Sequence, residues 1–98
     1  MNRFDEIRKD YDTICEAICQ YFEVSKEDLL KRNLKLCVDA RYVLIGIMCD
    51  EYDDYDIAIV SGLTKPCVNN IRNEMRYDAK KKRLSKYILY IKNELNKN

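Results

Sequence analysis

The chain has 98 residues, which suffices for one domain with one modest core and is too short to include a second, catalytic domain. Hydrophobic residues make up 47% and charged residues 36% of the sequence, as in ordinary globular domains. Two glycines and one proline leave little room for tight β-turns. We therefore expect an all-α fold of about six helices, in one domain over residues 1–98.

Several classes of protein are excluded by what the sequence lacks. No stretch is apolar over the ~18 residues that a membrane span needs, and the first ten residues are too polar for a secretion signal. We expect a cytoplasmic protein whose five cysteines are reduced thiols. The absence of histidine excludes Ser-His-Asp and Cys-His catalysis and histidine-containing zinc sites. We therefore expect no enzymatic activity, no cofactor and no metal.

The net charge of +1 conceals an uneven distribution along the chain. Residues 31–49 hold four bases against one acid, and residues 65–98 hold ten against three. Acids prevail elsewhere, with eight against four bases in residues 1–30 and five against none in residues 50–64. This arrangement predicts two separate basic surfaces, one around Lys31, Arg32 and Lys35 and one over the residues after Gly62.

Apolar residues recur at three- and four-residue steps along the first segment, which predicts an amphipathic helix over residues 3–23. The stripe consists of Phe4, Ile7, Tyr11, Ile14, Cys15, Ile18, Tyr21 and Phe22. The opposite face is acidic and is expected to be solvated. Ser25 followed by Asp28 resembles a capping box and predicts a short helix toward Arg32.

A basic loop, residues 32–35, precedes the most apolar segment of the chain. Asp39 is expected to cap a helix here, because aspartate is a preferred residue at a helix N-terminus. The apolar run at residues 42–48 is too continuous for a helix that has one face in solvent. We therefore expect the central buried helix at this position, ending near Tyr52.

Residues 54–76 have the spacing of a helix-turn-helix. This motif needs a small residue where the two helices cross, a glycine four positions later for the left-handed turn, and aliphatic residues six and nine positions beyond that glycine. These four positions are occupied by Ala58, Gly62, Val68 and Ile71. Thr64 is expected to cap the second helix, with Pro66 in its first turn. A helical hairpin with no DNA role would show the same packing pattern.

The last segment, residues 79–95, is predicted to form a C-terminal amphipathic helix. Its apolar stripe consists of Leu84, Tyr87, Ile88, Ile91 and Leu95. Four bases, Lys80 to Arg83, stand at its start, where the helix dipole favours acidic residues. This placement favours a phosphate-binding role over a solvated helix start. Tyr87, Tyr90 and Ile91 can complete either the core or a dimer seam, so the sequence leaves a homodimer open.

The order of these features resembles the C-terminal DNA-binding domain of the bacterial replication initiator DnaA, of the Trp-repressor-like fold group. The resemblance runs from Tyr11 to Met75 and is most specific in the Phe-x-Val-Ser-x-Glu-Asp-Leu-Leu stretch at residues 22–30 and the Ala-Arg pair at residues 40–41. It implies that Arg32 and Lys35 of the basic loop reach the minor groove and that Arg41 contacts phosphate. It also implies that the helix beginning at Thr64 enters the major groove.

The chain departs from this family in two respects. Between its glycine and valine the family has Arg-Asp-His-Ser/Thr-Thr, which reads the bases of the initiator box, whereas residues 63–67 here are Leu-Thr-Lys-Pro-Cys. The glycine-rich phosphate loop of the initiator's ATPase is also missing from the sequence. We therefore expect a stand-alone module, encoded by a phage or mobile element, that does not recognise the initiator box.

The first of two functions that remain open is binding of duplex DNA, as a regulator of transcription or replication. Asparagine amides match the donor and acceptor of the adenine edge, Lys65 can donate to guanine, and other bases can hold phosphates. The candidate DNA-binding residues are Arg32, Lys35, Arg41, Thr64, Lys65, Asn69, Asn70, Arg72, Asn73, Arg76, Lys80, Lys81, Lys82 and Arg83.

The second function is that of a protein-binding adaptor or inhibitor, acting on a host protein, which keeps the scaffold and has lost DNA recognition. Its support is the loss of the family's base-reading residues and an acidic block, Asp50, Glu51, Asp53, Asp54 and Asp56, that would repel phosphate. The position of this block distinguishes the two functions. Beside the recognition helix it would disfavour DNA binding, and on the opposite face it would not.

Overall fold

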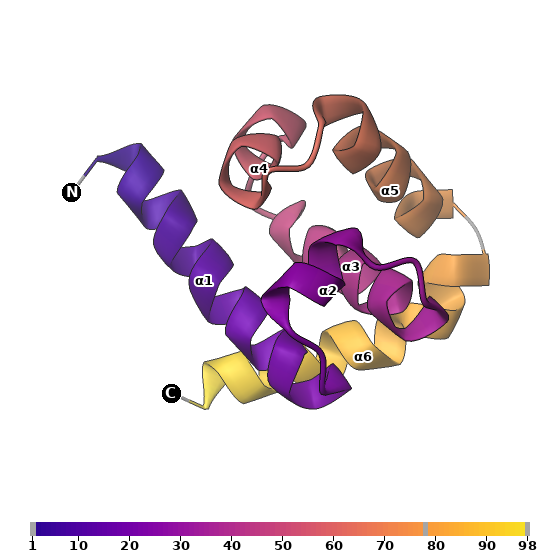
Figure 1. Ribbon diagram of the computed structural model, residues 1–98. Coiled ribbons are helices and arrows are strands. Elements are labelled where there is room, and N and C mark those ends of the chain that lie inside the picture. Colours follow the sequence, from indigo (N-terminus) through magenta and orange to yellow (C-terminus); the bar gives the residue numbers. More distant parts are fainter. Residues whose placement is uncertain (1, 78, 98) are drawn as a thin grey trace.

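The computed structural model describes residues 2–77 and 79–97, and over these residues the chain forms six α-helices and no strand (Figure 1). The all-α fold expected from the sequence is confirmed. The helices are α1 (Arg3–Phe22), α2 (Lys26–Lys31), α3 (Lys35–Met48), α4 (Asp54–Ser61), α5 (Lys65–Tyr77) and α6 (Ala79–Asn96). In the part of the chain described here, no helix is apolar over a length that would cross a bilayer.

The central helix is α3, which contacts α1, α2, α5 and α6. Val43, Leu44 and Ile45 on it are fully buried, as the apolar run predicts. Side chains from every other helix complete one core around it, including Ile18 of α1 and Ile91 of α6. Helix α4 packs mainly on α5 and on α1 (Figure 1), and it contributes Ile57 and Val60 to the same core.

The predicted boundaries of α3 are wrong at both ends. The helix begins at Lys35, and Asp39 does not cap it but lies in its second turn, where it binds Arg83. The early start buries Cys37, and burial of an apolar side chain stabilises by more than the ~1 kcal/mol of a typical cap. At the other end, α3 stops at Met48, and a turn at residues 49–51 leads to Asp53, which is extended and caps α4.

Two predicted caps are confirmed, and the apolar stripe of α1 is confirmed except at its ends. Ser25 Oγ accepts a hydrogen bond from the Asp28 amide at 3.1 Å and caps α2. Thr64 Oγ1 accepts one from the Cys67 amide at 3.2 Å, which caps α5. Phe4 and Tyr21 were expected on the buried stripe of α1, but both are exposed. Tyr21 instead packs its ring against aromatic side chains of α6.

The connection between α4 and α5 has the predicted packing. Gly62 has a φ of +77° and ends α4 in the left-handed conformation, with its N–H donating to the Ala58 carbonyl. Val68 and Ile71, six and nine positions beyond that glycine, are buried in the core, and α5 packs on α4. Three residues between the two helices therefore suffice to reverse the chain and to place α5 across α4.

We expect Gly62→Val to lower the free energy of unfolding by about 1–2 kcal/mol, the cost of a left-handed conformation for an ordinary residue. A Cβ at this position would meet no atom within 4 Å, so the loss comes from the backbone and not from a clash. Gly62→Asn is the control, because asparagine tolerates this conformation and is expected to lose much less. Thermal unfolding measures the stability of both variants. Equal melting temperatures for Gly62→Val and Gly62→Asn would contradict backbone strain as the cause of the loss.

Candidate nucleic-acid interface

Helix α5 has one buried face and one exposed polar face. Val68, Ile71 and Met75 point into the core. The opposite face consists of five predicted DNA-binding residues, Lys65, Asn69, Asn70, Asn73 and Arg76, all of them exposed. Thr64, which caps the helix, stands exposed at the start of the same face.

The side of this polar face that adjoins α4 is tied to Asp54. The Asp54 carboxylate is buried, at 8% exposure, and accepts a hydrogen bond from Asn69 Nδ2 at 2.9 Å. Its other oxygen pairs with Arg72 Nη2 at 2.8 Å. Asn73 in turn donates to the Asn69 amide oxygen at 3.2 Å. Three candidate DNA-binding residues therefore already use part of their hydrogen-bonding capacity within the protein.

Asn70 differs from these neighbours. Among the described residues it has no side-chain hydrogen bond to another residue, and it is exposed. Both its donor and its acceptor are therefore available to a ligand.

The acidic block does not form a single surface. Asp56 pairs with Arg3 of α1 at 2.5 Å, and Asp50 pairs with Lys92 of α6. Asp53 accepts a hydrogen bond from the Asp56 amide as the cap of α4. Asp54 adjoins α5, so one acid of the block does lie beside the candidate recognition helix, with its charge compensated by Arg72.

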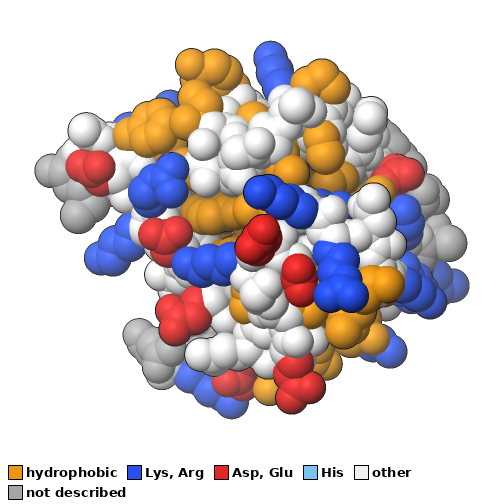
Figure 2. All heavy atoms as spheres, viewed as in Figure 1, with side chains coloured by type: hydrophobic (Ala, Val, Ile, Leu, Met, Phe, Trp, Pro, Cys, Tyr) orange, Lys and Arg blue, Asp and Glu red, His pale blue; other side chains and the backbone are white. Residues whose placement is uncertain are grey.

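The two basic segments meet in space. Arg83 near the start of α6 forms two hydrogen bonds of 2.9 Å to Asp39, which brings the start of α6 beside the first two turns of α3. Arg32, paired with Asp28 at 3.5 Å, lies in the connection from α2 to α3, and Lys35 is the first residue of α3. Figure 2 shows basic side chains gathered at the right-hand edge, while both signs of charge alternate over the rest of the viewed face.

Two residues predicted to contact phosphate have structural partners. Arg41 donates from Nε to the Leu29 carbonyl at 2.8 Å and from Nη2 to the Arg32 carbonyl at 2.9 Å. It thereby caps the C-terminus of α2, where free carbonyls favour a cation. Lys80 lies 4.2 Å from the ring centre of Tyr42 and 3.6 Å from Glu74. Burial lowers the pKa of Lys80, but these two partners outweigh it and raise the pKa, so the group stays charged.

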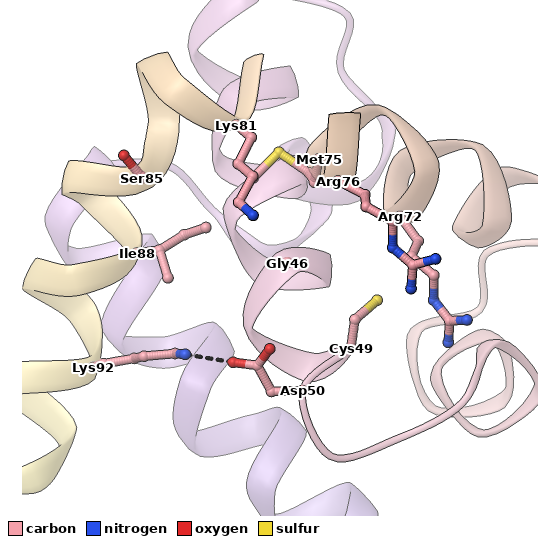
Figure 3. Close-up of a pocket in the computed structure, with 10 residues that line it drawn as sticks. All are labelled: Gly46, Cys49, Asp50, Arg72, Met75, Arg76, Lys81, Ser85, Ile88 and Lys92. Atoms are coloured by element: carbon pink, nitrogen blue, oxygen red, sulfur yellow. Dashed lines mark hydrogen bonds and ion pairs between the residues drawn. The ribbon is translucent and has the colours of Figure 1, made fainter. Parts of the chain in front are cut away.

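The four bases that open α6 separate into different environments. Lys80 and Arg83 bind the protein as described, and Lys82 is exposed. Lys81 lines a hollow of about 410 Å³ between α3, α5 and α6 (Figure 3). Arg72 and Arg76 line the same hollow from α5, and so does Lys92 from the second half of α6.

The sequence interpretation missed Lys92 as a functional candidate, although its spacing carries a signal. Lys81, Ser85, Ile88 and Lys92 stand at steps of four, three and four residues, which places them on one face of a helix. Arg72 and Arg76 are four residues apart and share a face of α5 in the same way. What the sequence did not indicate is that these two faces lie opposite each other.

Comparison of the chain with protein-family models, with curated proteins and with solved structures finds no significant match in any of the three.

Proposed function

We propose that the chain binds duplex DNA, with α4 and α5 as a helix-turn-helix and α5 as its recognition helix, and that it regulates transcription or replication. The observation that carries the proposal is the exposed polar face of α5, where lysine, asparagine and arginine side chains stand opposite a fully packed apolar face. A helix of this kind fits the major groove, where amides and cations can read base edges.

Side chains without a partner in the protein are the best candidates for contacts to bases or to phosphates. Asn70 and Lys65 are the side chains best suited to contact bases, since both are exposed and neither has a partner among the described residues. Lys35 at the start of α3 and Lys82 near the start of α6 are exposed bases. Both are suited to contact the phosphates of DNA. The resemblance to the DnaA C-terminal domain supports the same docking, with a recognition sequence of its own because residues 63–67 differ.

Fluorescence anisotropy with a labelled duplex tests this proposal, at ionic strengths of about 50 and 200 mM. We expect binding at the lower value and a steep loss at the higher one, because each phosphate contact releases counterions. Lys82→Ala should reduce the slope of log K against log salt by about one. Lys97→Ala, which removes an exposed lysine at the far end of α6, is the matched control and should leave the slope unchanged.

A second candidate function is favoured by the position of Asp54 and by two exposed apolar residues. Asp54 holds part of the polar face of α5, and Tyr55 and Ile59, one turn apart on α4, are 61% and 39% exposed. An adaptor that binds a host protein would use such an apolar pair. A folded protein that binds no duplex at the lower ionic strength would contradict DNA binding and favour the adaptor.

A further inference from the structure

We propose that the hollow between α3, α5 and α6 is a binding site for a small organic molecule that bears a phosphate group. Its volume of about 410 Å³ lies within the range of small-molecule sites. Figure 3 shows Lys81 and Lys92 of α6 on one side, Arg72 and Arg76 of α5 on the other, and Gly46 of α3 between them. The hollow shares Arg76 with the exposed polar face of α5, but a ligand could occupy it whether or not that face binds DNA.

The charge of the lining selects an anion. Four cations surround the hollow, and Asp50, paired with Lys92, is the one carboxylate among its described lining residues. Burial raises the pKa of the Cys49 thiol, which therefore stays uncharged beside these cations. Cations brought together around a concave surface repel each other and attract a counter-ion, and a phosphate supplies two negative charges at one point.

Arg72 also carries an unsatisfied donor. Its Nε is buried and has no hydrogen-bond partner of normal geometry among the described residues, the Cys49 thiol beside the guanidinium raises the pKa of Arg72, and Nη2 pairs with Asp54. The Arg72 side chain is 27% exposed, and a phosphate in the hollow would meet the accessible part of this guanidinium and accept charge-assisted hydrogen bonds from it. Arginine and lysine together are the residues by which proteins most often hold phosphate.

The floor of the hollow selects an organic ligand over the bare ion. Met75 and Ile88 supply apolar surface there, on either side of Gly46. A Cβ on Gly46 would lie 3.2 Å from Ile88 Cδ1 and from Met75 Cε, so glycine lets these two side chains approach α3 closely. Apolar atoms beside a charged rim suit a ligand with a carbon skeleton as well as a phosphate.

Titration followed by NMR and by calorimetry tests the site, with inorganic phosphate and AMP as the probes. We expect saturable binding of AMP below about 1 mM, tighter than that of inorganic phosphate, with shifts in the amide signals of Gly46, Met75 and Ile88. Lys81→Ala should weaken AMP binding about tenfold, the effect of one charge-assisted hydrogen bond. Lys86→Ala is the matched control, since this exposed lysine of α6 does not line the hollow, and it should bind AMP as the unchanged protein does.

Three outcomes would overturn the proposal. The first is no saturable binding of AMP, and the second is equal weakening of AMP binding by Lys81→Ala and Lys86→Ala, which would indicate diffuse attraction. The third concerns the source of the phosphate. If a duplex displaced AMP and Lys81→Ala weakened both ligands by the same factor, the hollow would belong to a nucleic-acid surface. Because AMP binding is measured without DNA, failure of this site and failure of the proposed function remain distinguishable.

Discussion

Replacing Arg72 by alanine is expected to lower the free energy of unfolding by about 2–3 kcal/mol, because it leaves the buried Asp54 carboxylate without its cation. Loss of one partner from a fully buried ion pair costs about 3–5 kcal/mol. The value here falls below that range for two reasons. The Arg72 side chain is 27% exposed, so water screens the pair, and Asn69 still donates to the carboxylate.

A double-mutant cycle isolates this interaction. We expect the pair Arg72→Ala and Asp54→Asn to cost clearly less than the sum of the two single changes, because the neutral amide needs no cation. Equilibrium unfolding in urea gives the four free energies. Additivity within ~0.5 kcal/mol would mean that the two residues do not stabilise each other.

The same cycle bears on the candidate interface. Asp54 orients Asn69, and Asn69 accepts a hydrogen bond from Asn73, so the ion pair holds two asparagines of the exposed face in place. The acid that the sequence marks as an obstacle to DNA binding therefore also arranges the side chains that DNA would meet. Asp54 can orient the asparagines without strongly repelling DNA because Arg72 neutralises its charge. A paired carboxylate repels phosphate less than an isolated one.

Local signals explain why most of the fold could be predicted. The three- and four-residue spacing of apolar side chains depends only on helix geometry, and it located α1 and α6, whereas the continuous apolar run at residues 42–48 located α3. The turn at Gly62 was predictable because a left-handed residue favours glycine, and Val68 and Ile71 follow at a fixed spacing. Prediction failed at Asp39, where the capping preference of aspartate is a weak local effect. A tertiary pair with Arg83, 44 residues away, determines its position instead.

The candidate site was predicted as a set of residue types and not as a set of contacts. The exposed asparagines of α5 follow from helix periodicity alone. The use of Arg41 to cap α2 and the bond from Asn69 to Asp54 depend on how the helices cross, which no local pattern contains. Sequence patterns therefore identify the polar face, while the structure separates side chains with partners from Asn70, which has none among the described residues.

Asn70→Ala is expected to relax the DNA preference at one or two base pairs while leaving non-specific affinity nearly intact. A bidentate amide contact to adenine is worth about 1–3 kcal/mol of discrimination between bases, whereas phosphate contacts are the same on every sequence. Selection from random duplexes, applied to the unchanged protein and to the variant, measures the preference directly. Asn93→Ala, which removes an exposed asparagine from α6, is the matched control and should select the same sequences as the unchanged protein.

The same selection separates this chain from the initiator that it resembles. If the resemblance holds, Thr64, Lys65 and Pro66 stand where that family has its base-reading residues, so we expect the initiator box to bind no better than a scrambled duplex of equal composition. Specificity then rests on Asn70 and on Lys65, the exposed side chains of α5 with no partner among the described residues. Enrichment of the initiator box by the unchanged protein, or identical motifs from it and from Asn70→Ala, would each contradict this assignment of the recognition helix.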